Sequence, residues 1–420
     1  MKSLITIICL IVLAFPLLAQ SNFEKSFNVT VTNPSAYPKH NALVIVPWSD
    51  LSAVTDFNSD AFIVTQNGKE IPSQIIRDAN KGIVFVADQI ASKEKQEFVI
   101  KYNTKGKIVK SYPKRTQAEL SYKTGGEWKN QEYIGGDFKN TDYLRVPKEH
   151  KDHSWFIRYE GPGWESDKVG YRFYLDQRNA TDVFGKLTPE MTLQNIGLDG
   201  FDSYHNMQPW GMDVMKVGKS LGIGSIGSFY NGTAIRVQDT DSVDCRITDN
   251  GNLYSSILTR YYGWKIGDRK TNLESTITIH AGTRLTHQQL LLSQTLDNIC
   301  TGIGRDKNAI LLKSEGDKNH FGYIATYGKQ SLNNDDLGLV VFFNPSHLKS
   351  FASDEFSHIV TLKPDNGKVD YYFAALWSKE PDGITNQSEF EKYLEEVAEN
   401  LASPIKIEVS TRAVMRKDNK

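Results

Sequence analysis

Cysteine is scarce in this sequence. Only three cysteines occur among 420 residues, and Cys9 lies in an apolar N-terminal run, which leaves Cys245 and Cys300 for the rest of the chain. Two cysteines allow one disulfide, but they exclude a disulfide scaffold and a cysteine-rich zinc site. Whether Cys245 pairs with Cys300 stays open at this point.

Net charge is almost absent as well. The 49 Lys and Arg residues nearly balance the 50 Asp and Glu residues, and no long basic run occurs. The overall field therefore attracts nucleic acid weakly, and we expect no nucleic-acid partner. An anionic ligand would need a local cationic pocket.

Apolar runs of membrane-spanning length are missing beyond the N-terminus. A basic start is followed by an apolar run from Leu4 to Leu18 and by a plausible cleavage point before Ser21. The run is short for a membrane span and has the form of a secretory signal peptide. We therefore expect residues 1–20 to be removed and the product to be periplasmic or secreted, without a membrane partner. An uncleaved membrane anchor is the alternative.

Several familiar site motifs are also missing. The sequence contains no Walker loop, no His-Glu-x-x-His and no Gly-x-Ser-x-Gly. The glycine-rich segment 218–224 lacks the context of a nucleotide loop, so we expect a tight turn that lets backbone approach a ligand or a strand. His150 and His153 flank Asp152 and could serve a metal, but their charged neighbours favour a solvated loop. We expect neither a metal nor another cofactor.

Short strands dominate the pattern. Alternating or apolar segments separated by turn residues predict a β-sandwich over residues 21–110, with strands at 26–32, 42–47, 82–87 and 96–102. Later strands are predicted at 155–159, 169–175, 233–237, 255–262, 273–280, 321–326, 337–343, 371–377 and 405–409. Two segments have helical character, 287–300 and 388–401, the latter with a capping-box pattern at Ser388. We predict a mostly β chain with few helices, in which residues 111–420 form a large antiparallel, supersandwich-like catalytic domain.

The segment from Trp155 to Gly222 concentrates aromatic, charged and glycine residues. On the strand 169–175, Tyr171 and Phe173 share one face, and Arg172 shares the other with Tyr174. Aromatic faces next to cations suit an acidic sugar. The candidate substrate-binding residues are Trp164 and Trp210 for stacking, Arg172 and Arg178 for a carboxylate or sulfate, and Lys216 and Lys219 as further cations.

His205 is the candidate acid/base residue of this segment, because histidine titrates near neutrality. Asp202 or Asp213 could orient it. Tyr171 or Tyr204 could be its catalytic partner, although a tyrosine needs a nearby cation to ionise easily. Structural roles are the alternative for each of these residues: a buried tryptophan in the core, an Asp176–Arg178 ion pair, or a loop histidine bonded to backbone.

Four blocks of this segment resemble a known family. They are Tyr159–Glu165, Tyr171–Asn179, Asp182–Lys186 and Asp213–Gly222. The chain resembles a secreted Bacteroidetes family of polysaccharide-utilisation clusters, formerly of unknown function, that includes an ulvan oligosaccharide dehydratase of marine flavobacteria. The resemblance implies removal of water from the non-reducing-end uronic acid of an acidic oligosaccharide. The 4,5-unsaturated product would then pass to an unsaturated-glycuronyl hydrolase, so the enzyme would act upstream of such hydrolases.

The candidate residues fit that chemistry. Elimination across C4 and C5 needs a cation on the carboxylate, which Arg172 or Arg178 would supply, and proton transfer, which His205 with Tyr171 or Tyr204 would supply. Two alternatives remain at this point. A polysaccharide lyase would use the same groups but expel a sugar, and a non-catalytic binding protein would need no poised histidine.

Overall fold

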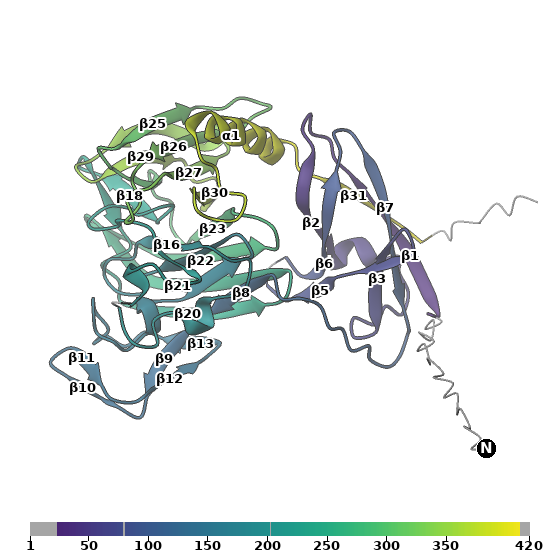
Figure 1. The fold of residues 1–420 in the computed structure, drawn as a ribbon, viewed down its shortest axis with the longest axis horizontal. Coiled ribbons are helices and arrows are strands. Elements are labelled where there is room, and N and C mark those ends of the chain that lie inside the picture. Colours follow the sequence, from purple (N-terminus) through teal and green to yellow (C-terminus); the bar gives the residue numbers. More distant parts are fainter. Residues whose placement is uncertain (1–22, 79, 202, 412–420) are drawn as a thin grey trace, which may run out of the picture.

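The computed structural model describes residues 23–78, 80–201 and 203–411, and the expected signal peptide lies outside this range. Two lobes lie side by side in Figure 1, a small N-terminal one and a large one. Residues 103–115 connect them without regular structure. The prediction of a mostly β chain is confirmed, since one α-helix occurs among the described residues.

The small lobe is a β-sandwich. One sheet has the order β31 (Lys406–Ser410), β1 (Lys25–Thr32), β7 (Lys95–Tyr102), β3 (Phe62–Gln66), β4 (Lys69–Ile71), and the other β2 (Lys39–Pro47), β6 (Gly82–Ile90), β5 (Ser73–Ile76). Alternate residues such as Val29, Val44 and Phe98 are fully buried between the sheets. A short 3₁₀ turn, η1 (Trp48–Leu51), follows β2. Because β31 pairs with β1, residues 406–410 belong to this small lobe. The predicted boundary at residue 110 instead assigns them to the large domain.

The large lobe packs two five-stranded sheets against a nine-stranded one. The nine-stranded sheet has the order β13 (Tyr143–Arg145), β20 (Ser242–Asn250), β21 (Tyr254–Ile266), β22 (Arg269–His280), β23 (Thr286–Leu292), β30 (Lys368–Trp377), β27 (Leu337–Phe343), β26 (Gly322–Gly328), β25 (Ala309–Ser314). The first five-stranded sheet has the order β17 (Gly211–Asp213), β16 (Thr181–Lys186), β15 (Val169–Phe173), β14 (Gly163–Ser166), β8 (Thr116–Glu119). The second has the order β19 (Thr233–Arg236), β18 (Gly227–Tyr230), β24 (Ile299–Gly304), β29 (Ser357–Leu362), β28 (Leu348–Ser353). All three sheets contribute to one hydrophobic core, for example Tyr171, Phe373 and Val360.

Small elements complete the large lobe. Two hairpin-like pairs project from it, β9 (Ser121–Thr124) with β12 (Asp137–Asn140) and β10 (Glu127–Lys129) with β11 (Glu132–Ile134). Four 3₁₀ turns lie in its loops: η2 (Arg158–Glu160), η3 (Leu193–Asn195), η4 (Ser203–His205) and η5 (Pro345–His347).

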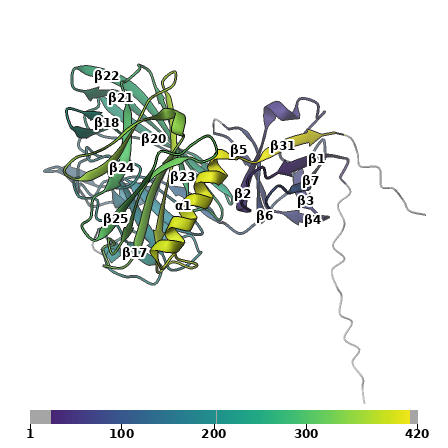
Figure 2. The same ribbon diagram turned by 90° about the horizontal axis from the view of Figure 1, so that it is seen from above.

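The helix predicted at 388–401 is confirmed as α1 (Gln387–Ala402). Its N-cap is Asn386 rather than Ser388, and the Asn386 side chain accepts a hydrogen bond from the backbone N–H of Glu389. The buried face, with Phe390 and Leu394, covers β26 and β27 on the outside of the nine-stranded sheet. Figure 2 shows α1 on the side of the large lobe that faces the small lobe.

Two secondary-structure predictions from the sequence are wrong. The segment 287–300 is not a helix, because β23 pairs with β22 and β30 and buries Gln288, Leu290 and Leu292 on one face, so strand pairing decides its structure. The segment 155–159 is not a strand either, because Trp155 and Tyr159 have positive φ and the chain enters η2.

Glycines 218–224 form the close backbone approach that the sequence predicts. Gly222 has φ +57°, and a Cβ there would lie 2.0 Å from the carbonyl oxygen of Thr181. A side chain at Gly222 would therefore push this loop off β16.

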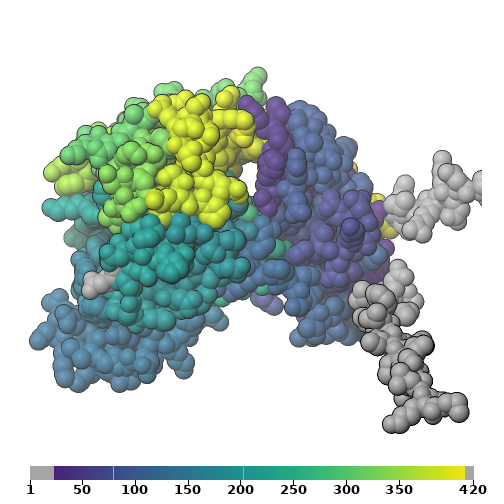
Figure 3. All heavy atoms as spheres, viewed as in Figure 1, coloured from purple at the N-terminus to yellow at the C-terminus, as the bar shows by residue number. Residues whose placement is uncertain are grey.

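Between the lobes lies a hollow of about 450 Å³, whose lining includes Lys39, His40, Arg284 and Tyr393. Figure 3 shows the opening beside the yellow residues of α1. The described residues include no helix long and apolar enough to cross a membrane. Cys245 and Cys300 are both buried and free, so they form no disulfide with each other.

Candidate active site

The candidate site is built on the outer face of the sheet that contains β15. As the sequence predicts, successive residues of β15 alternate: Tyr171 and Phe173 point into the core, and Arg172 points away from it. Arg172 pairs across the strands with Asp182 of β16, and Asp213 of β17 lies next to Phe184 one strand further. The loops that follow β13 and β16 cover this face and bury its charged side chains.

Arg172 is the centre of the site. Its Nη2 donates to Oδ2 of Asp182 at 2.8 Å and to Oδ2 of Asp213 at 2.7 Å. Its Nη1 donates to the Tyr204 hydroxyl at 2.8 Å and lies 3.6 Å from a carboxylate oxygen of Glu160. The side chain is only 2% exposed, so its donors are directed at these groups rather than at solvent. The expectation that Arg172 forks onto a substrate carboxylate is therefore corrected: its donors are bonded to carboxylates and a tyrosine of the protein itself.

Asp182 and Asp213 are two carboxyl groups that share one guanidinium. Burial, together with repulsion from Asp182, holds the pKa of Asp213 well above its ordinary value. The pair therefore holds a proton to a higher pH than an isolated aspartate does. Tyr174 donates its hydroxyl to Oδ2 of Asp182 at 2.6 Å, which completes the buried group.

His205 connects this buried group to solvent. It ends the short turn η4, its Nε2 lies 3.6 Å from Oδ2 of Asp213, and its side chain is 43% exposed. Partial burial, and then the charge of Arg172, lower the pKa of His205. The imidazole is therefore neutral near pH 7 and accessible, as a general base must be. Of its two proposed orienting residues the structure places Asp213 behind it, and Asp202 lies outside the described residues.

The two tyrosines expected to transfer protons have other positions. Tyr171 is fully buried; its hydroxyl donates to the Arg284 carbonyl at 2.7 Å and accepts from the Ala375 amide at 2.9 Å. Tyr204 is 1% exposed, and burial raises its pKa despite the guanidinium of Arg172. Both expectations are corrected, since both hydroxyls are buried and bonded within the protein: Tyr171 packs in the core and Tyr204 accepts a hydrogen bond from Arg172.

Arg178 is the centre of a second charged group, next to the first. Its Nη2 lies 2.5 Å from Asp176 and 2.7 Å from Glu160, and its Nη1 lies 2.8 Å from Asp152. The guanidinium also lies over the Tyr174 ring, 4.0 Å from the centroid. The alternative of an Asp176–Arg178 ion pair is thus observed. Because its donors are already taken up by carboxylates, Arg178 is not free for a substrate carboxylate.

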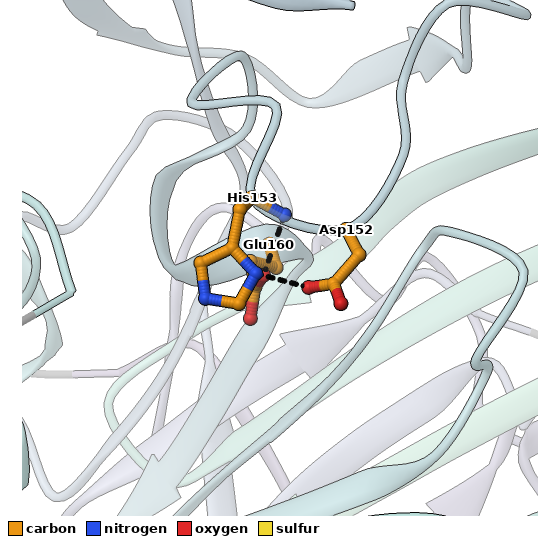
Figure 4. Close-up of side chains that lie close together, drawn as sticks. All are labelled: Asp152, His153 and Glu160. Carbon is orange, nitrogen blue, oxygen red and sulfur yellow. Dashed lines mark hydrogen bonds and ion pairs between the residues drawn. The ribbon is translucent and has the colours of Figure 1, made fainter.

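Glu160 joins the two groups and helps to form a cluster that the sequence prediction missed. One carboxylate oxygen faces Arg172, and the other accepts from Arg178 and from the backbone N–H of His153. His153 Nδ1 lies 2.5 Å from Oδ1 of Asp152, as Figure 4 shows. His153 and Asp152 are exposed, whereas Glu160 is buried. An unbroken chain of charged contacts therefore runs from exposed His205 to exposed His153.

The backbone of this cluster is held in an uncommon conformation. His153, Trp155, Tyr159 and Glu160 have φ of 57°, 61°, 38° and 70°. None of them is glycine, so each left-handed residue costs of order 1 kcal/mol or more. Such residues concentrate where a fold must aim particular side chains, and here the segment turns His153 outward and Glu160 inward.

The aromatic residues divide between core and site. Trp164 is 1% exposed, stacks on Tyr171 and donates its indole N–H to Thr286, so the expectation that it contacts sugar is corrected. Trp210 is partly exposed and packs edge-on against Phe184. Trp155, which the sequence analysis did not select, lies partly exposed against Phe201, 4.4 Å between ring centroids. Trp155 and Trp210 are therefore the rings available to a ligand.

The two candidate lysines lie on the loop after β17. Lys216 is directed at Asp306, 4.0 Å away, and Lys219 lies over the Phe356 ring. Asp306 follows β24 and Phe356 precedes β29, so both lysines are directed at the second five-stranded sheet and not at His205.

A cavity of about 560 Å³ adjoins the Arg178 group from the other side. Its lining includes Lys148, Lys151, Asp176, Asn179 and Gln238, so it offers polar groups of both signs. Asp176 belongs to both the cavity wall and the ion pair with Arg178. The cavity and the Arg178 group therefore share Asp176.

Comparison with known proteins places the chain in a family. Residues 31–407 match the family described as Domain of unknown function (DUF4861). The chain belongs to this family. A relative from Formosa agariphila, "Uncharacterized protein P7", is 23% identical over 274 residues, which cover 59% of this chain and 66% of that protein. The match therefore spans just under two thirds of the relative.

Two solved structures are similar over most of the chain. An alpha-mannosidase from Enterococcus faecalis V583 is 9% identical with a TM-score of 0.49, covering 93% of this chain and 46% of that one. A glycosyl hydrolase family 38 protein from Enterococcus faecalis is 8% identical with a TM-score of 0.49, covering 93% and 48%. The chain spans about half the length of both structures, and neither likeness carries information about its activity.

Proposed function

We propose that this DUF4861 protein is an oligosaccharide dehydratase, a carbon–oxygen lyase that removes water from the non-reducing-end uronic acid of ulvan-type oligosaccharides. The observation that carries the proposal is the position of His205: accessible, neutral at physiological pH, and backed by Asp213 and Arg172. The resemblance of the four sequence blocks to the dehydratase family supports the same reaction. The acidic oligosaccharide is its partner, export follows the expected signal peptide, and unsaturated-glycuronyl hydrolases act on the product.

One residue performs both proton transfers in this proposal. His205 takes the C5 proton, so the C5–H electrons form the C4=C5 bond while the C4–O bond breaks. The imidazolium, whose Nε2 lies 3.6 Å from Oδ2 of Asp213, gives the proton to the departing oxygen, which leaves as water. A single imidazole is sufficient for both proton transfers. Because Tyr171 and Tyr204 are buried, His205 is also the member of the three proposed catalytic residues that solvent can reach. Positioned general acid/base groups typically contribute about 10² to 10⁴-fold to the rate.

Trp155 and Trp210 support a sugar as the ligand. Both rings are partly exposed on the hydrophobic cluster that also contains Tyr204, the neighbour of His205. Flat aromatic surfaces bind the C–H faces of a pyranose while leaving its hydroxyls to polar groups. The cavity beyond Asp176 would accommodate further sugar units.

The experiment uses the mature protein with saturated, uronate-ended ulvan oligosaccharides, followed by ultraviolet absorbance and mass spectrometry. A gain of absorbance with loss of one water and no chain shortening is expected. Absorbance with shortened chains would make the protein a polysaccharide lyase. Binding without any product would make it a carbohydrate-binding protein.

A further inference from the structure

The charges of the site do not balance. The contacts join five carboxyl groups to two guanidinium groups: Asp152, Glu160, Asp176, Asp182 and Asp213 with Arg172 and Arg178. Arg236 interacts with Asp176 at longer range, and the Asp182–Asp213 pair, with its raised pKa, removes at most one further negative charge. Apart from the imidazoles, the group still carries negative charge. An anionic sugar would add to this excess, so the site needs a further cation.

We propose that Asp152, His153 and Glu160 bind a divalent cation of the zinc or manganese class. Each residue offers one ligand atom, and these atoms lie within 4.8 Å of one another. A tetrahedral zinc with bonds of about 2.1 Å separates its ligands by roughly 3.4 Å, so small side-chain rotations would close the site. Imidazole with carboxylates is a ligand set for zinc or manganese rather than for magnesium or calcium, which take oxygen alone.

The surroundings of the three residues suit a metal with an open position. Asp152 and His153 are exposed, so solvent or a ligand could reach the cation, while Glu160 is buried and would bind it from the protein side. Figure 4 shows the three side chains close together. Arg178 bonds to both carboxylates, at 2.8 and 2.7 Å, which leaves each carboxylate lone pairs for the cation. In this role Arg178 orients the ligands, as outer hydrogen-bond partners do in metal sites.

The cation would supply the substrate with a positive charge that the two arginines cannot supply. Because Arg172 and Arg178 are engaged by carboxylates, a metal on the exposed side is the group that would neutralise the uronate carboxylate. This second part rests on the proposed function, whereas binding of the cation does not.

The test is a binding titration without sugar. Chelator-treated mature protein is titrated with ZnCl₂ by calorimetry and with MnCl₂ by electron paramagnetic resonance. One saturable site is expected, and His153→Gln and Asp152→Asn should each weaken it by at least about tenfold. His320→Gln is the matched control, because His320 forms a similar exposed pair with Asp317, 3.1 Å apart. Circular dichroism and the thermal midpoint without metal establish that each variant folds.

Two results would overturn the inference. One is the absence of saturable binding by either cation up to about 1 mM, the weak end for extracellular metal sites. The other is unchanged binding in both His153→Gln and Asp152→Asn. The proposed function fails separately. Saturable metal binding without any product would contradict the dehydratase, whereas full turnover by metal-free protein would keep the dehydratase and contradict only the role of the cation in neutralising the uronate.

Discussion

Asp182 and Asp213 bind the same nitrogen of Arg172, with their Oδ2 atoms 2.8 and 2.7 Å from Nη2. The pair lies on neighbouring strands, fully enclosed, and its second member is also the carboxyl group behind His205. An exposed histidine is thereby linked to the centre of a buried charge group.

Replacing one member of this pair should be tolerated, and replacing both should not. Asp182→Asn or Asp213→Asn mimics the protonated partner, so each should cost about 1 kcal/mol or less of the free energy of unfolding. The double variant leaves Arg172 with Glu160 at 3.6 Å and should cost about 3–5 kcal/mol, as a buried charge without its partner does. Urea denaturation of the four proteins measures the coupling. Additive losses would show that the pair does not share one proton.

The lowered pKa of His205 predicts the acidic limb of the pH profile. Because burial and Arg172 both disfavour the imidazolium, the basic form persists to a pH below the ordinary histidine value of about 6.5. The midpoint of the acidic limb of kcat/KM should therefore lie below pH 6.5. A midpoint above that value would assign the base to another group.

Two tryptophans should differ in what their loss affects. Trp210→Ala should raise KM and change the thermal midpoint little, because the ring is partly exposed at the site. Trp164→Ala empties the core between the sheets and should cost about 3–5 kcal/mol. Steady-state kinetics and thermal melts of both variants measure this contrast. A Trp210→Ala variant with unchanged KM would remove that ring from the binding surface.

Glu380 makes stability depend on pH far from the candidate site. Its carboxylate accepts from Arg284 Nε at 2.6 Å, and burial, which outweighs Arg284, raises its pKa to about 7. The folded state holds this proton more tightly than the unfolded one. The stabilisation is therefore full below about pH 4.5 and is lost as the pH rises through 7, an effect on the order of 1–3 kcal/mol. Thermal melts of wild type and Glu380→Gln should diverge across this range. Parallel curves would contradict the assignment.

The sequence predicts the local pattern of the fold better than its long-range pairing. The alternation of Tyr171 and Arg172 and the helix at 388–401 follow from residue spacing, and both are present. The segment 287–300 reads equally as an apolar helix, and its partners, β22 and β30, lie elsewhere in the chain. Periodicity alone cannot decide such a segment.

The candidate site is predicted in part for the same reason. Residue chemistry points to His205 and Asp213, and the structure brings them together. Asp182 and Glu160 lie in the four sequence blocks named above. Their contacts with Arg172 depend on which strand pairs with β15 and on where the turn η2 lies, and neither follows from residue type. Residue type leaves Trp164 and Tyr171 open between core and site, since burial is a property of the packed sheets. The outward turn at His153 depends on positive φ in residues that rarely adopt it.

The most direct test of the account compares wild type, His205→Ala and the control His320→Ala on the same uronate-ended oligosaccharides. Product formation is followed by absorbance and mass, and binding by titration. Wild type and His320→Ala should form the dehydrated product at similar rates, while His205→Ala should bind the oligosaccharide and form no product above background. Product formation by His205→Ala at the wild-type rate would contradict the central claim that His205 performs the elimination.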